Sequence, residues 1–273
     1  MKILSIDCGI KTLSLCLLEI SQIKRSKAKE IFALLSDTRK IINKHIFLRN
    51  HKELNRVLDS VFKYTCSKRF KIIMWKKINL TLSEDLQDLM CSKCKFPAKY
   101  FSKETKIGFC TRHKIPISEL IKERTLTQST LTTSLVKVLD ALPTILTADT
   151  VLIENQPSKN NKMKTVQTLL YSYFTIRGVI DAQTVKKVIY VSPKYKLRGN
   201  TPNERQQINK LFANSSKKKG YAQRKDVSIS LAKKILTEHC PEYLLFLEQN
   251  KNKADDLCDS FLQAYSYFEI LNG

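Results

Sequence analysis

The stretch that decides the fold lies at the start of the chain, where residues 2–20 read KILSIDCGIKTLSLCLLEI. Residues 2–8 are a mainly apolar run with an aspartate near its end, and residues 12–20 are a second apolar run. Gly9 lies between the two runs, where its lack of a Cβ permits a tight turn. The stretch therefore predicts a β-hairpin with a buried first strand that carries Asp7 at its end.

The apolar pattern of the rest of the chain predicts alternating strands and helices. Strands are expected at 30–37, 150–155 and 186–191, and helices at 51–64, 129–146, 162–182, 223–238 and 254–271. Residues 66–125 differ, because they are rich in lysine, weakly periodic and contain a cluster of cysteines. This pattern predicts an α/β fold with a mixed sheet, built from residues 1–65 plus 126–273 and carrying an insert at 66–125.

The charge of the chain indicates its partner. Its 273 residues include 48 Lys+Arg against 25 Asp+Glu, a formal net charge of +23 that is spread along the whole sequence. Such a protein attracts polyanions, and nucleic acid is the partner we expect first. A ribosome-like or membrane-surface protein is the plainer interpretation of the same charge. No apolar stretch is long enough for a membrane span and no secretory signal precedes the first strand, so we expect an intracellular protein without a membrane partner. A viral replication site, the nucleus and an organelle are not distinguished.

Four acidic residues stand where the predicted elements begin or end. Asp7 ends the first strand, Glu154 ends the strand at 150–155, and Asp256 and Asp259 share one face of the last helix because they are three residues apart. Asp255 precedes this pair and can reach the same side. Converging carboxylates repel one another, and Mg²⁺ or Mn²⁺ removes that repulsion by binding the hard oxygen ligands that it prefers. We therefore predict a catalytic site in which the four residues hold two ions about 4 Å apart, a spacing that suits a phosphodiester.

Each of these carboxylates has a simpler interpretation when it is taken alone. An aspartate after a strand is often a turn residue, and a glutamate in a strand often pairs with a neighbouring lysine. Two aspartates at the start of a helix also interact favourably with the helix dipole. The prediction of a metal site depends on the four positions together.

A second predicted metal site lies in the insert. Cys91 and Cys94 form a C-x₂-C pair, and Cys110 and His113 form a C-x₂-H pair that follows 15 residues later. Two close pairs of such ligands suit tetrahedral Zn²⁺, and Gly108 suits the turn before the second pair. With four protein ligands the site has no open position, so we expect a structural zinc that folds a segment too small for its own core.

Basic residues follow two of the predicted site elements. The candidate DNA-binding residues are Lys159, Lys162, Lys164, Lys218, Lys219, Arg224 and Lys225. The first three follow Glu154 closely, and the other four flank the start of the helix at 223–238, whose N-terminal amides can also hold a phosphate. A solvated surface is an equally good interpretation for each residue.

Three segments of the chain resemble one known family. SIDCGIK at 5–11, LIENQP at 152–157 and KADDLCDSFL at 253–262 occur in the order of the RuvC-type Holliday-junction resolvases. The resemblance is closest to the branch found in poxviruses, other large DNA viruses and fungal mitochondria. NKMK at 161–164, and the KKG of 218–220 that leads to Arg224 and Lys225, also resemble that branch. The resemblance covers about two thirds of the chain and excludes roughly 66–125.

The resemblance implies an RNase H-like fold, a homodimer, and paired metal-dependent nicks in branched DNA across a four-way junction. It implies that Asp7 and Glu154 are metal ligands and that Asp256 and Asp259 are the family's last acidic pair, with Asp255 a less favoured substitute. The insert departs from the family pattern and puts the choice of substrate in doubt.

Other functions stay open at the level of sequence. The chain agrees with another RNase H-like nuclease without junction preference, or with a non-catalytic zinc-bearing protein that binds nucleic acid. A sugar-kinase or actin-like ATPase needs glycine-rich phosphate loops, which the 6 glycines do not supply. In transposon-type RNA-guided nucleases the zinc ribbon follows the glutamate, whereas the cysteine pairs here precede Glu154.

Overall fold

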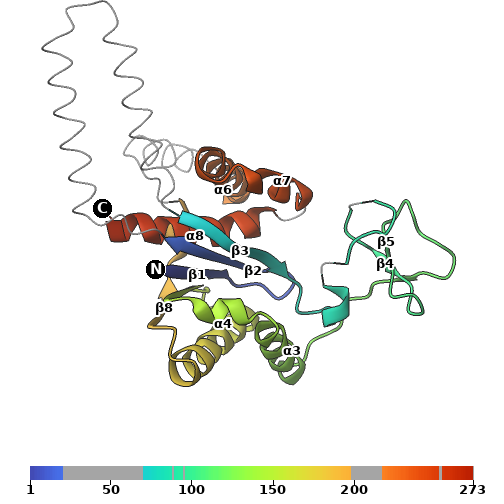
Figure 1. The fold of residues 1–273 in the computed structure, drawn as a ribbon, viewed down its shortest axis with the longest axis horizontal. Helices are drawn as coiled ribbons and strands as arrows, with labels where there is room; N and C mark the ends of the chain where they lie inside the picture. Colours follow the sequence, from blue (N-terminus) through green and yellow to red (C-terminus); the bar gives the residue numbers. More distant parts are fainter. Residues whose placement is uncertain (21–69, 88, 95, 198–216, 252–253, 273) are drawn as a thin grey trace, which may run out of the picture.

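The structure is a computed structural model that describes residues 1–20, 70–87, 89–94, 96–197, 217–251 and 254–272 (Figure 1). Its centre is a five-stranded sheet with the strand order β3-β2-β1-β7-β8. Strands β1 (Lys2–Asp7), β2 (Leu13–Ile20) and β3 (Phe70–Ile78) form an antiparallel meander. Strands β7 (Thr150–Glu154) and β8 (Lys187–Val191) run parallel to β1. This arrangement is that of an RNase H-like sheet, so the predicted α/β fold class is confirmed.

The predicted hairpin of residues 2–20 is present as β1 and β2. The two strands pair from Lys2 with Glu19 to Asp7 with Ser14. A Cβ added to Gly9 would lie 2.7 Å from the carbonyl oxygen of Thr12, so the turn between the strands requires glycine.

Helices cover both faces of the sheet. On one face lie α6 (Lys217–His239), α7 (Glu242–Gln249) and α8 (Ala254–Asn272), and on the other lie α3 (Gln128–Asp140) and α4 (Asn161–Tyr173) (Figure 1). The chain continues from α4 into a π-helix, η3 (Phe174–Asp181), and short 3-10 helices occur as η1 (Glu84–Leu86), η2 (Pro143–Thr147) and η4 (Pro193–Leu197). Two apolar cores result, one on each face, which explains why β1, β2 and β7 are almost continuously buried. None of the helices in the described ranges is long and apolar enough to cross a membrane.

The predicted start of the insert at residue 66 is wrong in one respect. Residues 70–78 form β3, which pairs with β2 along the edge of the main sheet. Phe70, Ile72 and Trp75 are buried in the core on the α8 side, and the indole Nε1 of Trp75 donates a hydrogen bond to the carbonyl oxygen of Leu257 at 2.9 Å. This strand therefore belongs to the core, and the insert begins after Ile78.

Two further differences concern the helices. The helix expected at 223–238 extends back at least to Lys217, and α7 lies between it and the last helix, where no element was predicted. The strand expected at 30–37 and the helix expected at 51–64 lie outside the described residues.

Residues 79–125 form a small unit of their own, which we call the cysteine–histidine module. It contains a three-stranded sheet of two-residue strands in the order β5 (Gly108–Phe109), β4 (Tyr100–Phe101) and β6 (Glu119–Leu120). The module lies at the end of the main sheet where β3 finishes (Figure 1).

Candidate functional site

Strand alternation places two of the predicted carboxylates on the same face of the sheet. Ile6 and Ile153 are register partners in the parallel pair β1 and β7, so Asp7 and Glu154 follow at neighbouring positions. Ile6 and Ile153 both point into the core beneath α3 and α4. Because successive side chains of a strand point to opposite faces, Asp7 and Glu154 both point toward α8.

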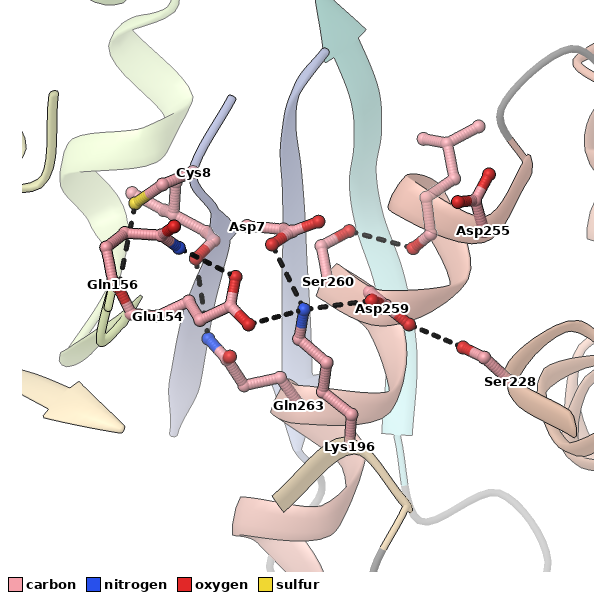
Figure 2. Close-up of polar contacts among 12 residues, drawn as sticks. Asp7, Cys8, Glu154, Gln156, Lys196, Ser228, Asp255, Asp259, Ser260 and Gln263 are labelled. Atoms are coloured by element: carbon pink, nitrogen blue, oxygen red, sulfur yellow. Dashed lines mark hydrogen bonds and ion pairs between the residues drawn. The ribbon is translucent and has the colours of Figure 1, made fainter. Parts of the chain in front are cut away.

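Asp259 and Lys196 complete a buried cluster with these two residues (Figure 2). The ammonium of Lys196, which belongs to η4, lies 3.0 Å from Asp7 Oδ1, 2.9 Å from Glu154 Oε1 and 2.9 Å from Asp259 Oδ2. The side chain of Lys196 is only 7% exposed, and those of Asp7 and Glu154 are 10% and 11% exposed. One ammonium therefore bridges three carboxylates that come from β1, β7 and α8.

The environment of the cluster shifts the pKa values of the two strand carboxylates, Asp7 and Glu154, in opposite directions. Burial raises the pKa of Asp7 well above its usual range, against the opposing effect of Lys196, and the neighbouring carboxylates raise it further. Burial also acts to raise the pKa of Glu154, but the hydrogen bond with Asp7 and the ammonium of Lys196 outweigh it, so that pKa falls. For Lys196, burial favours the neutral amine, but the three carboxylates raise its pKa and keep it charged.

Neighbouring polar groups hold the carboxylates in place. Ser228 of α6 donates a hydrogen bond to Asp259 Oδ1 at 2.5 Å, and its side chain is buried. Gln156 donates from Nε2 to Glu154 Oε2 at 3.0 Å, while its backbone N–H donates to Gln167 Oε1 at 2.9 Å. These bonds fix the orientation of two carboxylates before any substrate binds.

The start of α8 carries the other two aspartates. Asp255 is buried and forms an ion pair of 2.5 Å with Lys225 of α6, one helical turn before the bond between Ser228 and Asp259. Asp256 is half-buried on the same helix. Lys196 bridges three of the four predicted site carboxylates, Asp7, Glu154 and Asp259.

The donor set suits a divalent cation of the Mg²⁺ type. Three carboxylates converge and a single ammonium offsets them, so the cluster keeps an excess of negative charge. Gln263, one turn after Asp259, adds a buried Oε1 without a hydrogen-bond partner among the described residues. A cluster of oxygens with uncompensated charge is what Mg²⁺ and Mn²⁺ bind, so the residues fit the predicted ion.

The predicted DNA-binding residues lie on two sides of this site. Lys159 and Lys162 are exposed in and after the loop that follows β7, and Lys164 donates from Nζ to Asn155 Oδ1 at 3.1 Å. Lys225 forms the ion pair with Asp255 described above. Lys218, Lys219 and Arg224 lie on α6 by their backbone, and their side chains are outside the described part of the chain.

The four predicted zinc ligands converge in the module. Their ligand atoms all lie within 4.8 Å of one another. Cys94 Sγ is 3.7 Å from Cys110 Sγ, and His113 Nδ1 is 3.4 Å from Cys91 Sγ and 3.5 Å from Cys110 Sγ. Tetrahedral Zn²⁺ with its usual bond lengths requires about 3.8 Å between two sulfurs and about 3.6 Å between sulfur and nitrogen. The cluster therefore has the dimensions of a zinc site.

Local backbone structure prepares the cluster for a metal. Burial opposes ionisation of Cys91, but backbone N–H groups of Cys110 and Lys93 stabilise its thiolate and lower its pKa to about 6. Gly108 carries the chain past the first pair, where a Cβ would lie 2.7 Å from the carbonyl oxygen of Met90. A thiolate at neutral pH is the form that binds zinc.

Lys196 and Ser228 were not predicted as site residues. Lys196 stands in a stretch with many lysines, and its sequence gives no sign that it is the buried one. Its position offers one signal, since it follows β8, the neighbour of the strand that carries Glu154. A residue that follows a parallel strand lies at the same edge of the sheet as the residues that end the adjacent strands.

The fold and the cluster together define the class: an RNase H-like sheet with buried carboxylates where its central strands end. No family model matches the chain. Over 147 residues the chain is 37% identical to an uncharacterized protein of Acanthamoeba polyphaga mimivirus, a match that covers 50% of this chain and 34% of that protein. The chain thus spans about a third of the length of the curated relative that it matches.

Three solved structures align with most of this chain at low sequence identity. The yeast mitochondrial Holliday junction resolvase Ydc2 has a TM-score of 0.47 and 14% identity, over 98% of this chain and 78% of that one. The fowlpox virus Holliday junction resolvase has a TM-score of 0.45 and 16% identity, over 99% of each chain. Thermus thermophilus RuvC has a TM-score of 0.41 and 10% identity, over 100% of this chain and 96% of that one.

Proposed function

We propose that this protein is a metal-dependent endonuclease that resolves four-way DNA junctions by paired nicks. The observation that carries the proposal is the convergence of Asp7, Glu154 and Asp259 in one buried cluster. They stand at the motif positions that resemble the RuvC-type resolvases. The net charge of +23 suits a DNA substrate.

The residues of the cluster have separate tasks in this proposal. Asp7, Glu154 and Asp259, with Asp256 as the further candidate, hold two Mg²⁺ or Mn²⁺ ions. The ions would lower the pKa of the attacking water and stabilise the leaving 3′ oxygen. Gln156 and Ser228 keep Glu154 and Asp259 in the orientation that the ligands need. Burial of the cluster excludes bulk water and strengthens each charge interaction at the scissile phosphate.

The test is cleavage of a labelled four-way junction by the full chain, with Mg²⁺ or Mn²⁺, beside duplex, single-stranded and flap DNA. Symmetric nicks on the junction alone are the expected result. Equal cleavage of all substrates would leave a nuclease without junction preference. Tight binding of DNA without cleavage in the presence of either metal ion would disprove the proposed nuclease activity.

The alternative without catalysis is favoured by one specific observation. Lys196 already offsets part of the charge of the three carboxylates, which is what a protein that never binds metal there would require. In that case the chain is a zinc-bearing protein that binds nucleic acid. Binding of Mn²⁺ to the cluster, measured by calorimetry, separates the two functions.

We also propose that the module binds one structural Zn²⁺ through Cys91, Cys94, Cys110 and His113. The purified protein is expected to contain about one equivalent of zinc by elemental analysis. Replacing a ligand removes one of four bonds, so Cys110→Ser is expected to lose most of the metal and to make the module sensitive to protease. Cys240→Ser is the matched control, because Cys240 is also buried but packs in the core on the α8 side. Full zinc content in Cys110→Ser contradicts the assignment.

A homodimer is proposed from the two nicks that a four-way junction needs, since its two-fold symmetry suits two active sites. An apolar patch on α4, η3 and β8 is the surface we assign to it. The exposed side chains are Tyr171, Ile176, Val179, Ile180 and Tyr190, and the rings of the two tyrosines lie 5.0 Å apart. Tyr173 and Phe174, by contrast, are buried in the core.

Charge placed in this patch is expected to separate the protomers. The double variant Ile176→Asp and Ile180→Asp should elute as a monomer, whereas the wild-type protein elutes as a dimer, because a buried unpaired carboxylate is costly at an interface. Light scattering after gel filtration gives both masses. Leu245→Asp changes an equally exposed residue of α7 and should leave the mass unchanged. A monomeric wild-type protein at micromolar concentration contradicts the assignment.

A further inference from the structure

We propose that the cysteine–histidine module is a second DNA-binding surface, which holds the phosphate backbone beside the catalytic edge of the sheet. This inference rests on the proposed function and adds to it the part of the chain that contacts DNA away from the cleaved bond. It is carried by the position of the module, by the way it is fastened there, and by its charge.

The module emerges at the same edge of the sheet as the carboxylate cluster. β3 is antiparallel to β2, which is antiparallel to β1, so β3 and β1 run in the same direction. Ile78 at the end of β3 therefore lies at the edge where β1 ends in Asp7. Figure 1 shows the module beyond this edge, at the end of α8 where the chain enters that helix.

Contacts with the turn after Asp7 fasten the module to the site. The backbone N–H of Leu80 donates to the carbonyl oxygen of Ile10 at 2.8 Å. Lys11, in the same turn, forms an ion pair with Glu123, and Asn79 Nδ2 donates to Glu123 Oε1 at 3.3 Å. Both the entry and the exit of the module are thus bound to a turn that begins one residue after Asp7.

The entry and exit segments are also bound to each other. The backbone N–H of Arg124 donates to the carbonyl oxygen of Thr81 at 3.0 Å, and its Nη2 donates to the carbonyl oxygen of Leu82 at 2.9 Å. These bonds limit the orientations that the module can take. A surface held in one orientation loses less entropy on binding than one on a free tether.

The charge of the module is concentrated around the metal ligands. Residues 91–116 contain seven Lys and Arg and one acidic residue, Glu104. Three thiolates and one Zn²⁺ together contribute a single negative charge, so the stretch keeps a net charge of about +5. Six of the basic side chains are exposed in the structure: Lys93, Lys99, Lys103, Lys106, Arg112 and Lys114. Of these, Lys103 forms an ion pair of 2.8 Å with Glu119 of the module.

Aromatic rings hold two of these ammonium groups in place without neutralising them. Lys106 Nζ lies 5.5 Å from the centroid of the Phe101 ring, and Lys114 Nζ lies 4.9 Å from that of Tyr100. A ring face stabilises a cation but leaves its charge available to a phosphate. Stability of the module alone does not require this surface, since four metal bonds supply it. In a nuclease, the polyanion that lies at the edge of the sheet where β1 and β3 end is the phosphate backbone of the bound DNA.

The test compares two sets of four Lys→Gln substitutions. The module variant replaces Lys93, Lys99, Lys106 and Lys114, and the control variant replaces the exposed Lys71, Lys137, Lys187 and Lys233, which lie on β3, α3, β8 and α6. Both sets remove the same charge from the full chain. Each is made with Asp7→Asn so that the DNA stays intact, and the zinc content of each is measured to verify the module. Fluorescence anisotropy with a labelled four-way junction gives the dissociation constant at several salt concentrations.

Loss of direct phosphate contacts has a defined signature. The module variant is expected to bind about 10- to 100-fold more weakly at 0.1 M salt, and its slope of log K against log salt is expected to fall in magnitude by about 2 or more. The control variant should change the slope by less than half of that amount. Equal slopes and affinities for the two variants, with full zinc content, overturn the proposal.

Failure of this inference is distinguishable from failure of the proposed function. With Asp7 intact, the module variant is expected to bind the junction more weakly but still to nick it when Mg²⁺ is present, because the carboxylate cluster is unchanged. If the wild-type protein binds the junction but never cleaves it, the proposed nuclease activity is disproved, while the comparison of DNA binding by the two variants stays valid. If the wild-type protein cleaves the junction and the module variant binds it as tightly as the control variant does, the proposed function stands and only the role of the module in DNA binding is disproved.

Discussion

Asp7→Asn is expected to slow cleavage of a four-way junction by at least about a thousandfold while leaving the fold intact. Asparagine keeps the shape of the side chain but removes the charge that an ion at the scissile phosphate needs. Burial and the neighbouring carboxylates raise the pKa of Asp7, so this environment already disfavours the ionised form. The neutral amide therefore costs little stability in the absence of metal. Single-turnover cleavage and thermal unfolding of the same sample measure the two effects.

Asp149→Asn is the matched control for this experiment. Asp149 precedes β7 at the opposite edge of the sheet, where it accepts a hydrogen bond from the backbone N–H of Lys2 at 2.8 Å and one from Lys186 Nζ at 2.7 Å. These partners lower its pKa, so its ionised form stabilises the fold. We expect this variant to lose about 1 kcal/mol of stability and to cleave at the wild-type rate. Equal rates of cleavage by Asp7→Asn and Asp149→Asn would show that Asp7 has no role in catalysis.

The convergence of Asp7 and Glu154 could be predicted because the ends of buried strands can be recognised in the sequence. An apolar run that ends in an acid, found twice, predicts two carboxylates at one edge of a sheet, and parallel pairing of β1 and β7 brings Asp7 and Glu154 together. The cluster of Cys91, Cys94, Cys110 and His113 could be predicted for a similar reason, since close pairs of metal-binding residue types are short-range patterns. In both cases the information lies within a few residues.

Lys196 and β3 could not be predicted because their environment is made by distant segments. The ammonium of Lys196 is buried by β1, β7 and α8, and its own neighbours in sequence, Tyr195 and Leu197, give no sign of the three carboxylates. In β3, Lys71, Lys76 and Lys77 conceal the alternation of the apolar residues, and the register with β2 shifts between Leu17 and Leu18. That irregularity disrupts the period of two on which strand prediction depends.

Lys196→Met is expected to destabilise the protein without metal by about 3 to 5 kcal/mol. The substitution leaves the buried Asp7 and Glu154 and the half-buried Asp259 without their shared cation. They must then take up protons or remain charged in an apolar setting, and both outcomes cost folding free energy. Protonation raises the number of protons bound by the folded state above that of the unfolded chain. The loss is therefore expected to be smaller at pH 5 than at pH 8.

Mg²⁺ should restore much of this stability, because a divalent cation replaces the missing ammonium charge. At a concentration of 100 times its dissociation constant, the ion contributes about 2.7 kcal/mol. Lys186→Met is the matched control: its side chain is 77% exposed and pairs with Asp149, so it should cost about 1 kcal/mol or less and show no rescue by Mg²⁺. Urea denaturation of both variants, with and without Mg²⁺, measures these differences. If Mg²⁺ stabilises neither Lys196→Met nor the wild-type protein, the carboxylates form an ion cluster that serves the fold, and the binding protein without catalysis becomes the better account of the chain.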